Sequence, residues 1–324
     1  MHDPHHHDHT GHVHGHAHDH GHSHHNGGLG HSHAPASFGL AFAVGTTLNL
    51  GFVILEAIYG IISGSVALLA DAGHNFGDVL GLLIAWSATV LAKRAPSGRY
   101  TYGLRSSSIL AALLNALILL VTLGVIAVEA VERLIKPGPV SGVTMIIVAA
   151  IGIVINGATA LFFMRGREHD LNIRAAFSHM AADALISAGV VVAGALVWFT
   201  GRSWIDPMTS LALVAIVAVG TWGLLRDSVN LSLQAAPSGQ DPEEIGAFLR
   251  DCERVATIHD LHVWPMSTTE TALTVHLVVH SGYPGDQFAA DIASALKTRF
   301  DIRHATIQIE TEADFDCALE PHCG

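Results

Sequence analysis

The sequence predicts an α-helical membrane protein with six transmembrane helices, followed by a cytosolic α+β domain that is ferredoxin-like in outline. Half of the 324 residues are apolar and only 14% are charged, whereas soluble proteins carry about 25% charged residues. The apolar residues gather in six long stretches, and a polar segment with helix and strand patterns follows them. The net charge of −12 also disfavours nucleic-acid binding, which depends on a basic surface.

Residues 1–36 form a His-rich head that we expect to be cytosolic and disordered. This segment holds 15 of the 24 histidines, separated mainly by Gly, Ser and Asp. It has too few apolar residues to build a core, and it lacks the apolar stretch of a signal peptide. Clustered imidazoles bind Zn²⁺, Ni²⁺ and Cu²⁺, so we expect weak, exchangeable metal binding here. An engineered tag is the alternative, but the irregular spacing of the histidines argues against it.

Residues 37–230 are predicted to form the transmembrane domain. A spanning helix needs about 20 mostly apolar residues. Six stretches satisfy this length, at 38–62, 66–92, 107–134, 141–164, 176–199 and 206–226. Eight Lys and Arg side chains lie in the second and fourth connections and after the last stretch, and three lie in the opposite connections. Because positive charge is retained on the inside, this distribution predicts that both termini are cytoplasmic.

Residues 231–311 are predicted to form the soluble domain. Pro242 and the acids after it indicate the first turn of a helix, and the pattern continues as strand, strand, helix and strand. This αββαβ order is typical of a small sheet with helices on one face. In the strand ATIHDLHVW we expect His259 and Leu261 to share one face and His262 to take the other. Residues 312–324 are predicted to be a flexible tail.

Two histidine–aspartate pairs stand out inside the apolar stretches. His74 and Asp78 lie in the second stretch, and His179 and Asp183 lie in the fifth. Charged groups at membrane depth cost several kcal/mol (~3 kcal/mol or more), so each needs a reason. Residues i and i+4 share one face of a helix. Two facing helices would therefore direct two imidazoles and two carboxylates to one point.

This set of side chains suits Zn²⁺. Four N and O ligands match the tetrahedral preference of Zn²⁺, and two carboxylates balance its charge in a low dielectric. All four groups bind metal only when deprotonated, so protons compete with the ion around neutral pH. The alternative is that these pairs are buried hydrogen bonds between helices. We also expect the repeat Gly73, Gly77, Gly81 to bring the two metal-binding helices close together.

Two further acids lie in the first and second stretches. Asp71 precedes His74 by three residues and points to one side of it, so we assign it a structural or supporting role rather than ligation. Glu56 either lines the cavity or pairs with a loop arginine.

The segments SGSVALLADAGHNFGD, SHMAADALIS and HDLHVWPMSTTETALTVHL, together with the His-rich head, resemble the cation diffusion facilitator family, and its zinc, cobalt and cadmium exporters in particular. The resemblance covers residues 38–311. It implies a homodimer in the bacterial cytoplasmic (inner) membrane that exchanges Zn²⁺ for H⁺ by alternating access. The metallochaperone-like cytosolic domain of the family is also implied. The transport motif of the family falls on His74, Asp78, His179 and Asp183.

The resemblance also implies a second metal site in the cytosolic domain. His259, His276 and Glu310 match its ligands, whereas His304 is one position out of step and Arg303 takes the matching place. Independently, Cys317, His322 and Cys323 lie close together in the tail and could hold Zn²⁺. A tail with unreactive thiols is equally compatible with that sequence.

The sequence therefore favours a proton-coupled efflux protein for Zn²⁺, with Cd²⁺ and Co²⁺ as further substrates, rather than an enzyme. A membrane-anchored zinc sensor or buffer without transport is the main alternative. An intramembrane metalloenzyme is less favoured, because the chain has no HExxH motif and no spare catalytic acid beside the four ligands.

Overall fold

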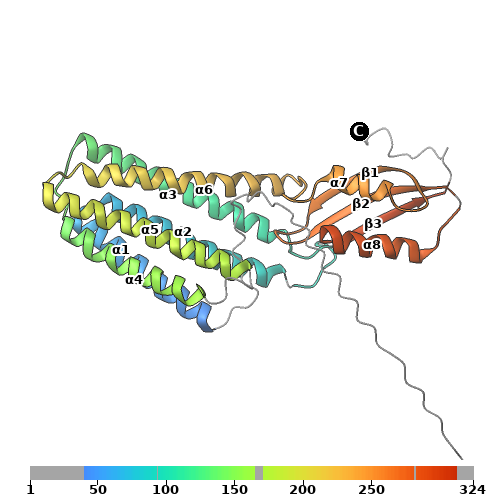
Figure 1. Ribbon diagram of the computed structural model, residues 1–324, viewed down its shortest axis with the longest axis horizontal. Coiled ribbons are helices and arrows are strands. Elements are labelled where there is room, and N and C mark those ends of the chain that lie inside the picture. The colour runs from blue at the N-terminus through green and yellow to red at the C-terminus, as the bar shows by residue number, and fades with distance from the viewer. Residues whose placement is uncertain (1–39, 93, 165–170, 281, 312–324) are drawn as a thin grey trace, which may run out of the picture.

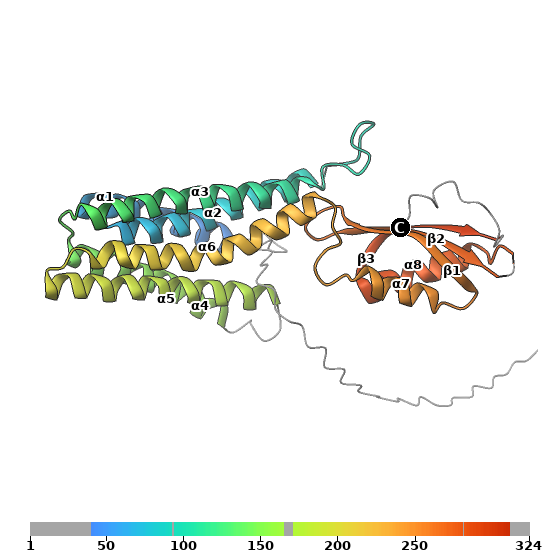
Figure 2. The same ribbon diagram turned by 90° about the horizontal axis from the view of Figure 1, so that it is seen from above.

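The computed structural model describes residues 40–92, 94–164, 171–280 and 282–311 (Figure 1). Six long helices form an elongated bundle, and a domain with three strands and two helices lies at one end of it (Figures 1 and 2). The bundle helices are α1 (Leu40–Ser63), α2 (Val66–Ala92), α3 (Ser107–Ile135), α4 (Gly142–Met164), α5 (Leu171–Thr200) and α6 (Ile205–Ser232). They coincide with the six predicted stretches, and α5 and α6 extend further than expected. The predicted head and the Cys317, His322 and Cys323 tail lie outside the described residues.

The surface of the bundle is apolar in the way a lipid-facing surface requires. Large hydrophobic side chains such as Ile62, Val121, Leu185 and Val219 are each more than two-thirds exposed. A helix that is apolar all round belongs in a core or a membrane. Four described segments are long and apolar enough to span a bilayer, at Ser107–Ile135, Gly142–Leu161, Phe177–Thr200 and Ile205–Ser232. The bundle is therefore a helical transmembrane domain.

The glycine repeat of α2 faces α3, and the expectation that it would face α5 was wrong. A Cβ atom on Gly73 would meet Ile126, one on Gly77 would lie 2.6 Å from Leu119 Cδ1, and one on Gly81 would lie 2.7 Å from Asn115 Nδ2. All three neighbours belong to α3. The repeat and His74–Asp78 share one helix, but Gly73 and Gly77 each precede a ligand by one residue, which is a rotation of about 100° around the helix. The glycines thus pack α2 against α3, on a different side from its two candidate ligands.

The first turn of α2 is fixed by a carboxylate from α6. The fully buried Asp206 accepts hydrogen bonds from Val66 N at 2.7 Å and Ala67 N at 3.2 Å. Its Oδ1 also accepts one from Ser65 Oγ at 2.5 Å. An acid at a helix N-terminus satisfies free N–H groups and opposes the positive end of the helix dipole. Asp206 thereby holds the helix that carries His74 and Asp78 against α6.

The C-terminal domain follows the predicted order of elements. It consists of α7 (Pro242–Arg250), β1 (Val255–Pro265), β2 (Thr271–Val279), α8 (Asp286–Phe300) and β3 (Ile302–Glu310). The sheet order is β1-β2-β3, with β1 antiparallel and β3 parallel to β2. Leu273, Val275 and Leu277 of β2 pack with both helices in one core. The alternate residues of β2, including His276, therefore lie on the other face of the sheet.

Strand β1 contains an irregularity at Asp260, whose φ of 51° is left-handed. The register shifts there, so that His259 pairs with His276 and His262 pairs with Thr274. Directly opposed residues of antiparallel strands share a face, which puts His259 and His262 on the same side as His276. The expectation of strict alternation through HDLH was wrong, because a bulge adds one residue to the count.

The connection between α2 and α3 contacts the C-terminal domain. Arg105 forms an ion pair with Glu270 at 3.1 Å. Ser106 Oγ donates to Met266 O at 3.2 Å, and Thr268 N donates to Ser108 Oγ at 3.1 Å. These contacts join the start of α3 to the turn between β1 and β2.

Candidate metal-binding sites

The first candidate site lies between α2 and α5, as the paired motifs predicted. His74 Nε2 is 3.3 Å from Asp183 Oδ1, and His179 Nε2 is 3.4 Å from Asp78 Oδ2. Within each helix, His74 Nδ1 is 3.7 Å from Asp78 Oδ2, and His179 Nε2 is 3.6 Å from Asp183 Oδ2. We call these four residues the helical cluster. Each histidine therefore lies near both carboxylates.

The spacing of these atoms matches the edges of a coordination tetrahedron. Zn²⁺ binds N and O ligands at about 2.0–2.2 Å, and tetrahedral geometry then separates neighbouring ligands by about 3.3–3.6 Å. The individual His–Asp separations lie in or just above this range, although they involve both ring nitrogens of His74 and both oxygens of Asp183. A ligand atom from each of His74, Asp78 and Asp183 can be chosen within 4.8 Å of the others. These three side chains can thus approach one small ion, and His179 lies beside two of them.

The helical cluster combines burial with access. The Asp183 side chain is 2% exposed, whereas His179 is 24% exposed. His74 Nδ1 and both oxygens of Asp183 are buried and complete no hydrogen bond within the described residues. Buried polar atoms without hydrogen bonds are expensive, and a bound cation or proton would satisfy them.

A polar group lies behind the helical cluster, toward α1. Asp71 accepts a hydrogen bond from Ser187 Oγ at 2.9 Å, which agrees with the supporting role expected for it. Glu56 accepts one from Asn75 Nδ2 at 3.3 Å and is fully buried. Among the described residues Glu56 forms no ion pair, and the loop arginines Arg165 and Arg167 lie outside the described residues. Sequence reasoning missed Asn75 and Ser187, which carry no charge to draw attention to them.

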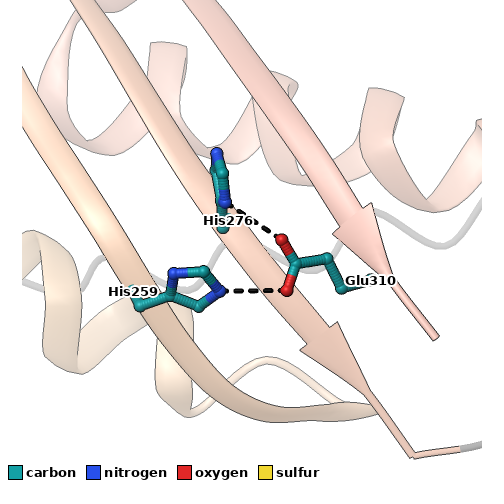
Figure 3. Close-up of side chains that lie close together, drawn as sticks. All are labelled: His259, His276 and Glu310. Atoms are coloured by element: carbon teal, nitrogen blue, oxygen red, sulfur yellow. Dashed lines mark hydrogen bonds and ion pairs between the residues drawn. The ribbon is translucent and has the colours of Figure 1, made fainter. Parts of the chain in front are cut away.

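The second candidate site lies on the helix-free face of the sheet, where Figure 3 shows His259, His276 and Glu310 converging from three strands. Glu310 Oε2 is 3.0 Å from His259 Nε2, and Oε1 is 3.0 Å from His276 Nδ1. We call these three residues the sheet cluster. Although burial raises the pKa of the Glu310 carboxyl, the hydrogen bonds from His259 and Gln308 hold it below its usual range. The three side chains offer ligand atoms within 4.8 Å of one another.

The surroundings of the sheet cluster differ from the sequence expectation. His304 pairs with Ala272, four residues along β2 from His276, and its ring packs on Tyr102. The structure therefore does not bring His304 to the cluster. Instead, Asp260 lies 3.5 Å from His276 Nε2 and 2.7 Å from His262 Nε2. In a regular strand Asp260 and His262 would lie on the face opposite His259, and the bulge brings them to the face of His276.

Together these features define a class of protein: a helical membrane protein with a His/carboxylate cluster inside the bundle and a second one in an attached domain. The chain belongs to the cation efflux family. It matches "Cation efflux transmembrane domain" over residues 42–231 and "Cation efflux protein, cytoplasmic domain" over residues 237–312. The family and its relatives are cation transporters and not enzymes, which excludes the metalloenzyme alternative.

Several bacterial relatives are similar over most of the chain. Zinc transporter ZitB of Escherichia coli (strain K12) is 37% identical over 273 residues, which cover 84% of this chain and 86% of the relative. The cadmium, cobalt and zinc/H(+)-K(+) antiporter of Bacillus subtilis (strain 168) is 33% identical over 81% of this chain and 86% of the relative. The metal cation efflux system protein CzcD of Cupriavidus metallidurans is 33% identical over 80% of this chain and 82% of the relative.

Proposed function

We propose that this protein exports Zn²⁺ from the bacterial cytoplasm across the inner membrane in exchange for protons, with all six bundle helices crossing the bilayer. The observation that carries the proposal is the helical cluster, whose His–Asp separations of 3.3–3.7 Å fit a tetrahedral Zn²⁺. The names of the relatives support this substrate class, since they include a zinc transporter and a cadmium, cobalt and zinc antiporter. Cd²⁺ and Co²⁺ are proposed as further substrates.

Charge balance explains how such an ion can cross a bundle interior. Two carboxylates and two neutral imidazoles around Zn²⁺ give a neutral assembly, which avoids much of the cost of burying charge. When the ion leaves, protons can take its place on the same groups, because metal and proton compete for the deprotonated ligands. The relative from Bacillus subtilis is named as an antiporter with H⁺, which supports this coupling.

We propose a regulatory role for the C-terminal domain, which in this scheme is cytosolic and ferredoxin-like. The sheet cluster would bind a second Zn²⁺ through His259, His276 and Glu310, and Asp260 could supply another carboxylate. The match to the cytoplasmic domain described as ZT_dimer supports a homodimer formed with this domain's help. Both termini would be cytoplasmic, so the His-rich head would collect metal on the uptake side.

Flux into proteoliposomes that carry a proton gradient tests this function. We expect Asp183→Ala to abolish Zn²⁺ uptake, because it removes the most buried ligand of the helical cluster. Asp227→Ala, which removes an exposed acid from α6, should transport as the unmodified protein does. Zn²⁺ uptake by Asp183→Ala at the unmodified rate would refute the proposal. A protein that binds Zn²⁺ but transports none would instead be a sensor.

A second flux experiment addresses the His-rich head. Deleting residues 1–33 should change the apparent affinity or rate and leave transport intact, because the proposed pathway lies in the bundle. A completely inactive truncation would contradict this view of the head as a metal-collecting segment. Comparing Zn²⁺, Cd²⁺, Co²⁺ and Mn²⁺ in the same vesicles would give the order of substrate preference.

A further inference from the structure

The polar group behind the helical cluster contains two carboxyl side chains that the four-ligand site does not use. Glu56 of α1 is 0% exposed and Asp71 of α2 is 1% exposed. The amide nitrogen of Asn75 lies between them, 3.3 Å from Glu56 Oε2 and 3.4 Å from Asp71 Oδ1. Ser187 of α5 donates to the other oxygen of Asp71. The two acids are thus neighbours deep within the bundle.

No cationic side chain among the described residues forms an ion pair with either acid. The helices packed against α1 and α2 contribute few other ionisable groups. Helix α4 has none, and Arg133 of α3 and Asp206 of α6 lie at the N-terminal end of α2, where Asp206 caps the helix. His74 and Asp183 of the helical cluster are the remaining groups that act electrostatically on Asp71. Two adjacent carboxylates in such surroundings cannot both stay ionised at low cost.

Two buried atoms of this group indicate where a proton would sit. Glu56 Oε1 and Asn75 Oδ1 are buried, and neither has a hydrogen-bond partner among the described residues. Both belong to side chains that are 0% exposed. A protonated Glu56 becomes a donor, whereas an ionised carboxylate only accepts. A carboxylic acid at Glu56 could therefore donate to a neighbouring acceptor such as Asn75 Oδ1 or Asp71.

We propose that Glu56 and Asp71 share one proton and release it when Zn²⁺ occupies the helical cluster. This inference rests on the proposed function and adds to it a proton-binding site that is distinct from the metal ligands. Asp71 precedes His74 by one helical turn, which places the two side chains about 5–6 Å apart at Cβ. A divalent charge at that distance favours the ionised form of a nearby acid. Metal and proton would then exclude one another without sharing a ligand.

A proton fits this group better than a second metal ion. Donor groups on Ser187 and Asn75 already point at three of the four carboxylate oxygens. A metal would need those oxygens to face it and would place the donor hydrogens against a cation. A proton needs a single acceptor instead. Glu56 Oε1 is a carboxylate oxygen without a donor among the described residues.

Calorimetric titration of the purified full chain with Zn²⁺ tests this proposal. Running the titration in two buffers of different ionisation enthalpy gives the number of protons released per Zn²⁺ bound. We expect Glu56→Gln to bind Zn²⁺ but to release about one proton fewer than the unmodified protein at the same pH. Asp227→Asn is the matched control, because it makes the same change from acid to amide at an exposed position of α6, and its proton release should equal that of the unmodified protein.

Asp71→Asn gives a second measurement if Glu56→Gln does not fold. It should lower proton release by the same amount, since either change leaves one acid of the pair. Proton release equal to that of the unmodified protein in a variant that binds Zn²⁺ would overturn the proposal. If the unmodified protein transports no Zn²⁺, the proposed function fails instead.

Discussion

The helical cluster and the sheet cluster are built from the same kinds of side chains, but they differ in charge and in the backbone that holds them. Between α2 and α5, two carboxylates face two imidazoles and could neutralise a divalent ion completely. On the sheet, Glu310 lies 3.0 Å from both His259 and His276, and Asp260 lies near His276 and His262. The first arrangement suits a site from which water is largely excluded, and the second suits a domain surface.

The two clusters also differ in what keeps their ligands together without metal. In the sheet cluster, contacts of 3.0 Å between the Glu310 carboxylate and each imidazole hold the three side chains together. In the helical cluster the His–Asp distances are 3.3–3.7 Å, longer than good hydrogen bonds. A transport site must release its ion, and ligands on separate helices can part when the helices move. Ligands on hydrogen-bonded strands cannot part in this way.

The largest expected effect distinguishes the two clusters by function. His179→Ala should lower the rate of Zn²⁺ transport by more than about 100-fold, since even groups that only support a metal ligand commonly contribute 10–100-fold. His276→Ala, the same change in the sheet cluster, should leave the maximal rate within about tenfold, because its metal is not carried. Vesicle flux of both variants measures the contrast. Equal losses in the two would mean that the sheet cluster is part of the transport path.

The helical cluster could be predicted from the sequence because its geometry is local. Residues i and i+4 share a face in any α-helix, so His74–Asp78 and His179–Asp183 needed only the assumption that two helices meet. The packing partner of a helix is not local information. The glycine repeat of α2 indicated a close contact, but nothing in its spacing distinguished α3 from α5 as the neighbour.

The sheet cluster was harder to predict because its geometry is not local. Register between strands fixes which residues meet, and one inserted residue reverses the face of those beyond it. The bulge at Asp260 is such an insertion. It places His262 on the same face as His276, whereas regular alternation would place it on the opposite face. The expected ligand His304 does not reach the cluster, because the parallel register of β3 places it beside Ala272 of β2. The αββαβ order itself was predictable from composition and turn residues.

The next effect concerns the packing that places the helical cluster. A methyl group on Gly77 would lie 2.6 Å from Leu119 Cδ1, so Gly77→Ala should destabilise the bundle by about 1–3 kcal/mol through overpacking. Gly124→Ala on α3 is the matched control, because no atom lies within 4 Å of its added methyl group. Alanine should there be neutral or stabilise the helix. Thermal unfolding in detergent measures both, and equal stabilities would contradict the assigned contact between α2 and α3.

A smaller effect is expected from pH at the sheet cluster. The pKa of Glu310 is lowered in the folded domain, below the usual value of about 4.3. Its contribution to stability is therefore fully present above about pH 5 and is lost as the pH falls through the folded pKa. In chelator, the unfolding midpoint of the C-terminal domain within the full chain should fall between about pH 5 and pH 3. Glu310→Gln should flatten that dependence, and an unchanged slope would show that another group titrates.

The smallest effect is expected where the two halves of the molecule touch. Arg105 and Glu270 are 38% and 35% exposed in their 3.1 Å ion pair, and exposed pairs contribute about 0–1 kcal/mol. Arg105→Ala should therefore change stability by less than about 1 kcal/mol and leave metal binding at both clusters unchanged. A salt titration of the unmodified protein is the companion measurement, because screening weakens such a pair without a mutation. If Arg105→Ala altered Zn²⁺ flux without altering stability, the contact would carry a signal between the sheet cluster and the start of α3. The two clusters would then act as one coupled system rather than as separate sites.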